Sequence, residues 1–457
     1  MVTGTSPRLD DRRPAAGRRW WRALGVALGV ALALAGATLS TAPAHAGGAQ
    51  GGSWALAGRL STDRTGATAT LLADATVVVA GGGTPEVASA EVFDPATGTW
   101  SPTGSMGTAR SLHAAVRLPD GRVLVSGGAV GSNALSSAEI YNPISRTWAP
   151  TAAMAVSRQG HTATVLAGGK VLVVGGLGGG HGPYRAEAEL FDPATGTWAP
   201  TGALAQGRAH HSATLLADGR VLVVGGEADT HGDSVRDAVV YDPVAGSWSP
   251  VPRLMSVGRA DHTATALPDG TVLVAGGTKV YIGGRPENVL ASTELLDRSG
   301  QAFLPAPAMA QRRDRHTATA LPDGRVLVSG GKGDQIATPT ATAEIYDPAA
   351  RRWKAATPMP GSAAGHNAVL VSGSGCSPAC GKVLVVGERA AYLFTPPPAG
   401  SAGPSRVGSV VGGLGAGAVA VLAASVGVVV SRRRRRGAPA GPKTTSRRGT
   451  TQTLEHR

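Results

Sequence analysis

Residue patterns that mark enzymes and metal centres are scarce in this sequence. No paired carboxylates, nucleophile elbow or phosphate-binding loop stands out among its 457 residues. Only two cysteines are present, Cys376 and Cys380, and no further Cys or His lies near them in the sequence, which argues against a metal pair. Their place in a Gly/Ser/Pro-rich stretch of a chain with an export signal predicts a local disulfide. The sequence therefore predicts neither an enzyme nor a cofactor.

Between its two ends the chain has almost no net charge. The formal charge is +13, but residues 1–46 contain six Arg and two Asp, and residues 432–457 contain nine Lys or Arg and one Glu. Residues 47–431 hold the remaining 28 basic and 27 acidic residues. Because the basic residues cluster at the ends, the high charge does not indicate a nucleic-acid partner.

The N-terminal end has the features of an export signal. Five arginines between Arg12 and Arg22 precede the apolar run 23–37, and Ala44-His45-Ala46 fits a cleavage site of small residues. Residues 1–46 are therefore predicted to be a secretory signal peptide. We expect the chain that follows to be exported.

The C-terminal end has the features of a membrane anchor. Residues 407–431 carry no charge and are long enough to cross a bilayer, and the five arginines 432–436 mark the cytoplasmic side. We expect a single-pass cell-membrane protein with residues 47–394 outside, a Pro/Gly/Ser stalk at 395–406 and a basic cytoplasmic tail at 432–457. Small residues at four-residue spacing in the transmembrane helix favour a homodimer through that helix: Gly408, Gly412, Gly413 and Gly417.

A unit of about 50 residues recurs between the two ends. Each unit contains an apolar run ending in Gly-Gly, such as VLVSGG at Gly330-Gly331, then a Tyr-Asp run such as IYDP at Asp347, then an aromatic residue. Short apolar runs bounded by Gly, Pro and Asp predict four antiparallel strands per unit and hence an all-β propeller. The aromatic residue, expected to pack between blades, is Trp54, Trp100, Trp148, Trp198, Trp248, Phe303 or Trp353.

This unit resembles the kelch repeat, and the resemblance covers about three quarters of the chain. Seven apolar runs end in Gly, but the last unit stops after its third strand at Phe394, while Trp54 stands alone ahead of the first unit. We therefore expect a seven-bladed propeller whose last blade is completed by the N-terminal strand, which leaves no open sheet edge.

The motif Arg-x-x-His opens five of the first strands and should form a ring near one mouth of the central channel. One interpretation is structural: each Arg makes an inter-blade ion pair with the Glu that recurs ahead of the Tyr-Asp run, and His is hydrogen-bonded beside it. The other is a positive collar that binds an anionic ligand. The candidate ligand-binding residues of this collar are Arg110, Arg158, Arg208, Arg259 and Arg313.

The variable loops that follow each Gly-Gly should surround this ring, and loops on a rigid scaffold commonly carry recognition. In the longest loop, 278–293, Tyr281 and Arg285 are candidate ligand-binding residues. The loop 227–238 places oxygen ligands at Glu227, Asp229 and Asp233, loosely similar to a calcium loop. His231 and the missing distal Glu argue against calcium, which is the alternative to the absence of a cofactor.

Kelch-like propellers host both binding proteins and enzymes, so the resemblance does not decide function. Galactose oxidase has this fold with a copper site and a Tyr–Cys crosslink, but here both cysteines lie in one late loop and no Tyr-His pair occurs. The sequence predicts a cell-surface binding protein that recognises a protein or an envelope polysaccharide through its variable loops. The alternative is an extracellular oxidase or hydrolase with loop-borne catalytic residues.

Overall fold

The computed structural model describes residues 51–399 except 181, 229–232, 282–284 and 334–337. The signal peptide and transmembrane helix expected from the sequence, the cytoplasmic tail and the stalk from residue 400 onward lie outside the described residues. Every regular element in the described part is a β-strand, and no helix there could span a membrane.

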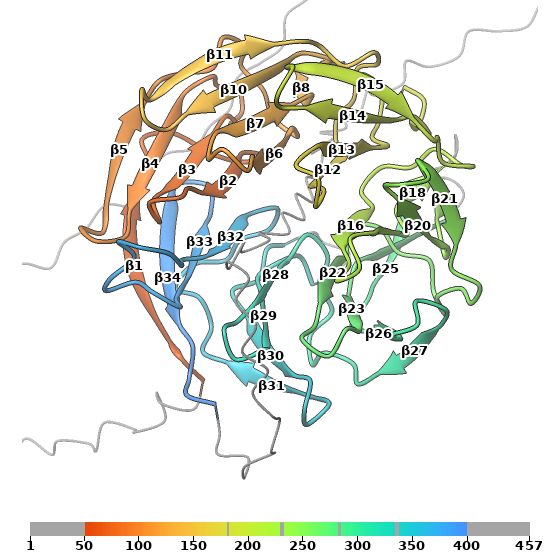
Figure 1. Ribbon diagram of the computed structural model, residues 1–457. Coiled ribbons are helices and arrows are strands. Elements are labelled where there is room, and N and C mark those ends of the chain that lie inside the picture. Colours follow the sequence, from red (N-terminus) through yellow and green to blue (C-terminus); the bar gives the residue numbers. More distant parts are fainter. Residues whose placement is uncertain (1–50, 181, 229–232, 282–284, 334–337, 400–457) are drawn as a thin grey trace, which may run out of the picture. The chain divides into compact units, whose positions relative to one another are not determined.

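Seven four-stranded antiparallel sheets form the blades of a propeller (Figure 1). Blade 1 is β2 (Thr68–Leu71), β3 (Val77–Ala80), β4 (Ala90–Asp94) and β5 (Thr99–Thr103). Blade 2 is β6 (Ala114–Arg117), β7 (Val123–Ser126), β10 (Ala138–Asn142) and β11 (Thr147–Thr151). Blade 3 is β12 (Thr162–Val165), β13 (Val171–Val174), β14 (Ala188–Asp192) and β15 (Thr197–Thr201). Blade 4 is β16 (Ser212–Leu215), β17 (Val221–Val224), β20 (Ala238–Asp242) and β21 (Ser247–Pro250).

The remaining blades follow the same order. Blade 5 is β22 (Thr263–Ala266), β23 (Val272–Ala275), β26 (Thr293–Leu296) and β27 (Phe303–Ala306). Blade 6 is β28 (Thr317–Ala320), β29 (Val326–Ser329), β30 (Ala343–Asp347) and β31 (Arg352–Ala356). Blade 7 is β32 (Asn367–Leu370), β33 (Val383–Val386), β34 (Ala390–Thr395) and β1 (Ser53–Arg59).

Three variable loops contain hairpins of their own. These are β8 (Ala129–Val130) with β9 (Asn133–Ala134), β18 (Glu227–Ala228) with β19 (Asp233–Ser234), and β24 (Thr278–Tyr281) with β25 (Arg285–Val289).

The propeller closes as expected. The first strands of neighbouring blades touch all the way round, from β2 through β6, β12, β16, β22 and β28 to β32, which contacts β2 again. The N-terminal strand β1 pairs with β34, with Trp54 opposite Phe394. A seven-bladed ring in which the two ends of the described chain share one sheet is confirmed.

The core lies in the seams between blades. The second strands are buried along their whole length, as the VLVV run of β13 shows, and each apolar cluster combines residues of two neighbouring blades. The indole N–H of each Trp donates to a backbone carbonyl of the preceding blade, for example Trp148 Nε1 to Gly104 O at 2.8 Å. Phe303 has no N–H to donate, so the seam between blades 4 and 5 has no bond of this type.

Candidate functional site

The segment that carries Arg-x-x-His lies at the base of the variable loop of the same blade. In blade 3, Gln159 and Leu177 exchange two backbone hydrogen bonds of 3.0 and 2.8 Å. In blade 5, Ala260 and Thr278 pair in the same way. Since the first residues after each Gly-Gly pair with the residue after each Arg, the Arg-x-x-His ring and the variable loops share one face, which we call the loop face.

Each motif Arg is a clamp on the two stems of its loop. In blade 3, Arg158 Nη1 donates to Gly175 O at 2.6 Å and to Glu187 O at 2.9 Å, which are the residues where the loop leaves β13 and approaches β14. Arg158 Nη2 donates to Glu189 Oε1 at 2.8 Å, and the other oxygen of Glu189 accepts the backbone N–H of Ala155 at 2.7 Å. The guanidinium thereby joins the loop, the third strand and the incoming connection.

The same ion pair recurs in five blades, with one variation in a sixth. The Arg–Glu distances are 2.6 to 2.8 Å, for Arg64–Glu91, Arg110–Glu139, Arg158–Glu189, Arg259–Glu294 and Arg313–Glu344. In blade 4, Val239 stands at the position of the Glu, and Arg208 pairs instead with Asp237 at 2.7 Å.

This geometry corrects two expectations. The arginines proposed as a ligand-binding collar are 0–1% exposed, so their guanidinium groups present no surface to a ligand: Arg110, Arg158, Arg208, Arg259 and Arg313. The structural interpretation fits, but the ion pairs lie within a blade and not between blades. The reason is that the Glu of the third strand faces the connection that enters its own blade.

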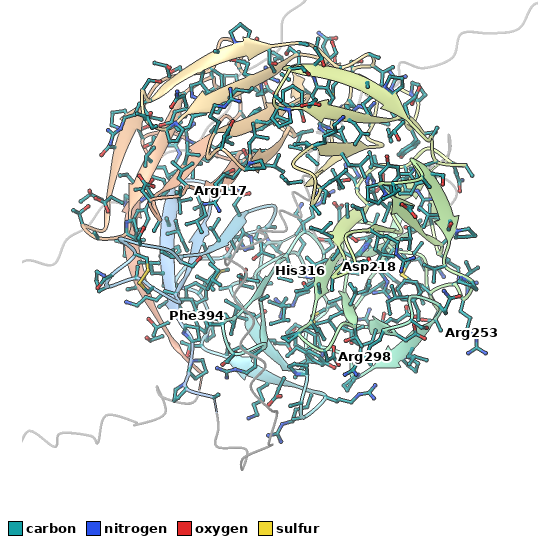
Figure 2. All side chains as sticks on the ribbon, viewed as in Figure 1. Arg117, Asp218, Arg253, Arg298, His316 and Phe394 are labelled. Atoms are coloured by element: carbon teal, nitrogen blue, oxygen red, sulfur yellow. A yellow bond between two sulfur atoms is a disulfide. The ribbon has the colours of Figure 1, made fainter. Side chains whose placement is uncertain are left out.

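The motif His makes the bond between blades. His161 of blade 3 has its Nε2 3.1 Å from Ser126 Oγ of blade 2, and His316 of blade 6 has its Nε2 3.0 Å from Thr263 Oγ1 of blade 5. Figure 2 shows His316 among the inner strands, whereas Arg253 projects at the outer edge. Burial, reinforced by the nearby Arg110, lowers the pKa of His113 to about 3, and burial with Arg259 lowers the pKa of His262 to about 3. These imidazoles are therefore neutral at neutral pH.

The close approach of this His explains the first Gly of Gly-Gly. A Cβ on Gly127 would lie 2.6 Å from His161 Cε1 and 2.5 Å from Arg158 O. Gly127 also has a φ of 59°, in the left-handed region. The strand-ending Gly of one blade and the Arg-x-x-His of the next are thus one interlocking unit.

The residue just before each motif His, and before the equivalent Ala67 of blade 1, lies on a ring near the propeller axis, the inner ring. Its members are Gly66, Leu112, Gly160, His210, Asp261, Arg315 and Gly365, and all have positive φ. Six backbone hydrogen bonds link them in blade order, for instance Asp261 N to His210 O and Arg315 N to Asp261 O, both 3.0 Å. Left-handed backbone is costly for residues other than Gly, so the side chains at these positions invite a functional explanation.

Charged side chains gather on one side of this ring. His210, Asp261 and Arg315, from the starts of blades 4, 5 and 6, join Glu227 at the base of the blade 4 loop; we call these four residues the polar cluster. His210 Nδ1 lies 3.4 Å from Glu227 Oε2, and Arg315 Nε donates to Asp261 Oδ2 at 3.0 Å. Tyr184 of the blade 3 loop donates its hydroxyl to Glu227 Oε2 at 3.2 Å.

The pKa of the histidine in the polar cluster is shifted upward, whereas the pKa values of the motif histidines are shifted downward. Burial alone would lower the pKa of His210, but the carboxylates of Glu227 and Asp261 raise it to about 9. Burial also acts on Asp261, where it raises the pKa, yet Arg315 and His210 outweigh it and the pKa is lowered. The cluster is thus a region of negative potential that stabilises a cation at His210.

The loops around the polar cluster support one another. Gly180 of the blade 3 loop donates to Ser132 O of the blade 2 loop at 2.5 Å, and Ser234 of the blade 4 hairpin donates to Thr278 O of blade 5 at 3.1 Å. The candidates Tyr281 and Arg285 are backbone partners in the blade 5 hairpin. Their side chains lie outside what the structure describes. The loops of blades 2–5 form a continuous rim on the loop face.

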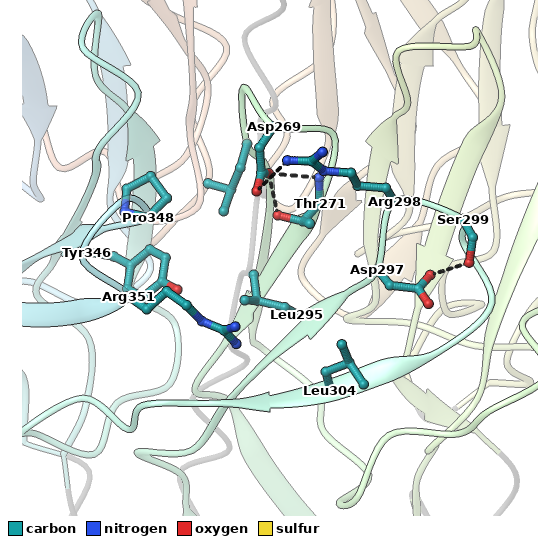
Figure 3. Close-up of a pocket in the computed structure, with 11 residues that line it drawn as sticks. Asp269, Thr271, Leu295, Asp297, Arg298, Ser299, Leu304, Tyr346, Pro348 and Arg351 are labelled. Carbon is teal, nitrogen blue, oxygen red and sulfur yellow. Dashed lines mark hydrogen bonds and ion pairs between the residues drawn. The ribbon is translucent and has the colours of Figure 1, made fainter. Parts of the chain in front are cut away.

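A groove of 410 Å³ lies between blades 5 and 6, among the turns that join first to second and third to fourth strands (Figure 3). Leu304, Leu295 and Tyr346 line it, with the Asp269–Arg298 ion pair at its edge. In blade 1 the strand residue corresponding to Ala306 is Thr103, whose hydroxyl bonds the Tyr141 hydroxyl at 2.7 Å. We assign this groove no ligand.

The chain matches two kelch families. The family described as the KLHDC2/KLHL20/DRC7 kelch-repeats domain matches residues 66–277, and the kelch motif family matches residues 315–360. The chain is a kelch-repeat β-propeller. The comparison with curated proteins finds no match.

Solved structures share the fold of this kelch propeller at low sequence identity. A fungal alcohol oxidase of the AA5 family, in complex with copper, is 20% identical with a TM-score of 0.61, over 76% of each chain. The structure of YjhT is 16% identical with a TM-score of 0.52, over 65% of this chain and 99% of that one. At these identities the likeness shows the fold and does not transfer an activity.

Three residues of the polar cluster, His210, Asp261 and Arg315, were not among the candidates from the sequence. A usable signal was present: when the kelch units are aligned on their motif His, the preceding position is Gly or Leu in four blades and His, Asp or Arg in the other three. Glu227 was considered for calcium together with Asp229 and Asp233. Asp229 lies outside the described residues, and Glu227 instead meets His210 and Asp261.

Proposed function

We propose that this kelch propeller is the outward-facing recognition domain of a single-pass cell-surface protein. Its ligand, a protein or an envelope polysaccharide, binds on the loop face over blades 2–5. Support for the location comes from the predicted signal peptide at 1–46, the uncharged span 407–431 and the arginines that follow it.

The observation that carries the proposal is the asymmetry of the loop face. The Arg–Glu pairs and motif histidines are engaged in holding the fold, so they are not available to a ligand. The polar cluster and the rim of blades 2–5 lie on one side of the loop face. They do not belong to the repeated Arg–Glu pairs that hold the blades. Rigid scaffolds with variable loops on one face commonly bind through those loops.

The test uses one substitution placed on each face. Val130, in the blade 2 hairpin, is 38% exposed on the loop face, and Val244, in a third-to-fourth strand turn, is 96% exposed on the opposite face. Full-length protein in detergent is assayed for binding to polysaccharide and protein fractions of its own host's envelope. We expect Val130→Glu to weaken saturable binding at least about tenfold through the cost of burying a charge. Val244→Glu should leave binding unchanged.

Equal binding by both variants would overturn the assignment to the loop face. Absence of binding to either fraction by folded wild-type protein would overturn the proposed ligand classes.

A second candidate is an extracellular hydrolase, favoured by one observation. Three titratable groups with ligand or proton-transfer chemistry, His210, Glu227 and Asp261, converge at backbone positions of which two have positive φ. Product release from a bound polysaccharide, measured by mass spectrometry, should then be abolished by Asp261→Asn. Binding without any product would rule out this candidate.

A further inference from the structure

The polar cluster contains the one group of three potential metal ligands found among the described residues. A nitrogen of His210 and carboxylate oxygens of Glu227 and Asp261 all lie within 4.8 Å of one another. The His210 Nδ1 to Glu227 Oε2 distance is 3.4 Å. Two ligands about 2.0–2.1 Å from a tetrahedral zinc ion are separated by about 3.3 Å, so this pair is already spaced as two ligands of one ion.

A second observation concerns two of the same side chains. The Asp261 side chain is 3% exposed, and its Oδ1 has no hydrogen-bond partner among the described residues. His210 Nδ1, too, forms no hydrogen bond within that part of the chain, although Glu227 Oε2 lies 3.4 Å away. A buried carboxylate oxygen without a partner costs free energy, and coordination of a cation would remove that cost.

We propose that His210, Glu227 and Asp261 form a binding site for a divalent transition-metal ion. One imidazole and two carboxylates are a mixed nitrogen and oxygen set, which suits Zn²⁺ and Mn²⁺ better than Ca²⁺, whose ligands are oxygens. Zn²⁺ should bind more tightly than Mn²⁺, in the order of intrinsic affinities for such ligands. Three protein ligands leave a position for a water or a ligand oxygen.

The surroundings hold these ligands in place. Arg315 binds Asp261 Oδ2 and leaves Oδ1 free, and Tyr184 binds Glu227 Oε2. A Cβ on Gly160 would lie 3.1 Å from His210 Nε2, so the imidazole rests against a residue that has no side chain. Such outer contacts orient metal ligands and are part of a built site.

The charge balance favours a cation. With a neutral imidazole, Glu227, Asp261 and Arg315 together carry one negative charge. The neighbouring Asp314 and Lys332 carry opposite charges and interact with Arg315 and with each other. A divalent ion would turn this local charge from −1 to +1, whereas a proton on His210 would only neutralise it. The proton is the competitor of the metal at this site.

The other blades provide an internal control. At the inner-ring position before the motif His, blades 2 and 3 carry Leu112 and Gly160, and the residue after Gly-Gly is Ala129 or Leu177. None of these four residues can bind a metal through its side chain. The site is therefore a departure from the repeat and not a consequence of it.

The test measures metal binding to the full-length, tag-free protein in detergent, stripped with chelator. Zn²⁺, Mn²⁺ and Ca²⁺ are titrated separately at pH 8 by calorimetry, and Co²⁺ is used as a spectroscopic substitute for zinc. We expect about one high-affinity Zn²⁺ per chain, weaker Mn²⁺, and a visible Co²⁺ ligand-field band.

The variants remove a ligand while keeping the backbone. His210 and Asp261 have φ values of 55° and 53°, which Asn tolerates well, so His210→Asn and Asp261→Asn should fold. Glu227→Gln is isosteric, and Glu187→Gln is the control because Glu187 is an exposed carboxylate of the neighbouring loop. Each ligand variant should lower Zn²⁺ affinity at least about tenfold and change the Co²⁺ spectrum, and the control should do neither.

Equal Zn²⁺ affinity and unchanged Co²⁺ spectra in the three ligand variants would overturn the proposal. So would folded wild-type protein that binds none of the transition metals in these titrations. This readout does not depend on an envelope ligand, so failure of the metal site and failure of the proposed recognition function are distinguishable.

Discussion

Blades 1–6 have a variable loop between their second and third strands, and blade 7 does not. This difference explains why the buried pair of an Arg and a carboxylate recurs in the chain. Each of the first six has a variable loop, a buried Arg and a carboxylate that pairs with it. In blade 7 the second and third strands are joined by a tight turn closed by Gly387 N to Ala390 O. There Ala363 stands in the Arg position and Tyr392 in the Glu position.

The comparison shows that the Arg–Glu pair serves the loop. Blade 7 builds the same four strands without the pair, so the sheet itself does not need it. Where a loop must leave and return, its two stems end in carbonyls that the guanidinium binds, as Arg158 does with Gly175 and Glu187. A fixed clamp below allows the loop above to vary in length and composition.

The largest effect should come from breaking one clamp. Arg158→Gln leaves Glu189 buried and unpaired, which should lower the free energy of unfolding by roughly 3–5 kcal/mol. Arg122→Gln is the matched control, because Arg122 pairs with Asp120 on the surface and should contribute no more than about 1 kcal/mol. Urea unfolding of both variants is the measurement. Similar losses of unfolding free energy in both variants would show that the buried pair contributes no more than a surface ion pair.

A smaller loss of stability is expected at the contact between the Gly-Gly of one blade and the Arg-x-x-His segment of the next. Gly127→Ala places a Cβ against Arg158 O and His161, whereas Gly121→Ala, at a turn with φ of 88°, places one where nothing lies within 4 Å. Backbone strain of about 1–2 kcal/mol applies to both. Overpacking of about 1–3 kcal/mol applies to Gly127→Ala alone. In thermal unfolding, Gly127→Ala should therefore be less stable than Gly121→Ala. The reverse order would contradict the close packing of Gly127 against the Arg-x-x-His segment of the next blade.

The smallest effect, counted per residue, is the pH dependence of folding stability that the motif histidines cause. Their folded pKa values lie below the unfolded value near 6.5, at about 3 for His113 and about 4 for His366, where burial is the leading cause. The unfolded chain binds more protons between these values, so stability is complete above pH 6.5 and falls as the pH drops toward 4. Each histidine contributes about 1.4 kcal/mol per pH unit in that window.

His113→Gln keeps a hydrogen-bonding group near Thr68 and should reduce this slope by one histidine's share. Denaturant unfolding of wild type and variant at pH 7.5, 6 and 5 measures it. An unchanged slope would mean that His113 is not held neutral in the folded protein.

Repetition made most of the fold predictable from the sequence. Seven Gly-terminated runs and an aromatic residue in register determine blade number, strand order and even the closure by Trp54, because each feature is tied to a backbone turn or a seam. The disulfide between Cys376 and Cys380 is present as expected. Local patterns suffice where each blade repeats the same contacts.

The candidate site was only partly predictable, since it depends on departures from the repeat. A motif seen five times favoured Arg158 and its equivalents, but recurrence here reflects burial. His210, Asp261 and Glu227 come from different blades and meet only because the inner ring brings neighbouring connections together. The blade in which an Arg finds its partner is likewise set by the path of the connection, which sequence spacing does not specify.

Hydrogen–deuterium exchange of Arg158→Gln against wild type tests the loop-clamp account most directly. If the Arg holds the loop, amides of residues 177–187 should exchange faster in the variant, while those of β13, β14 and the other blades keep their protection. Faster exchange spread evenly over all blades, or unchanged exchange in the loop, would contradict the account.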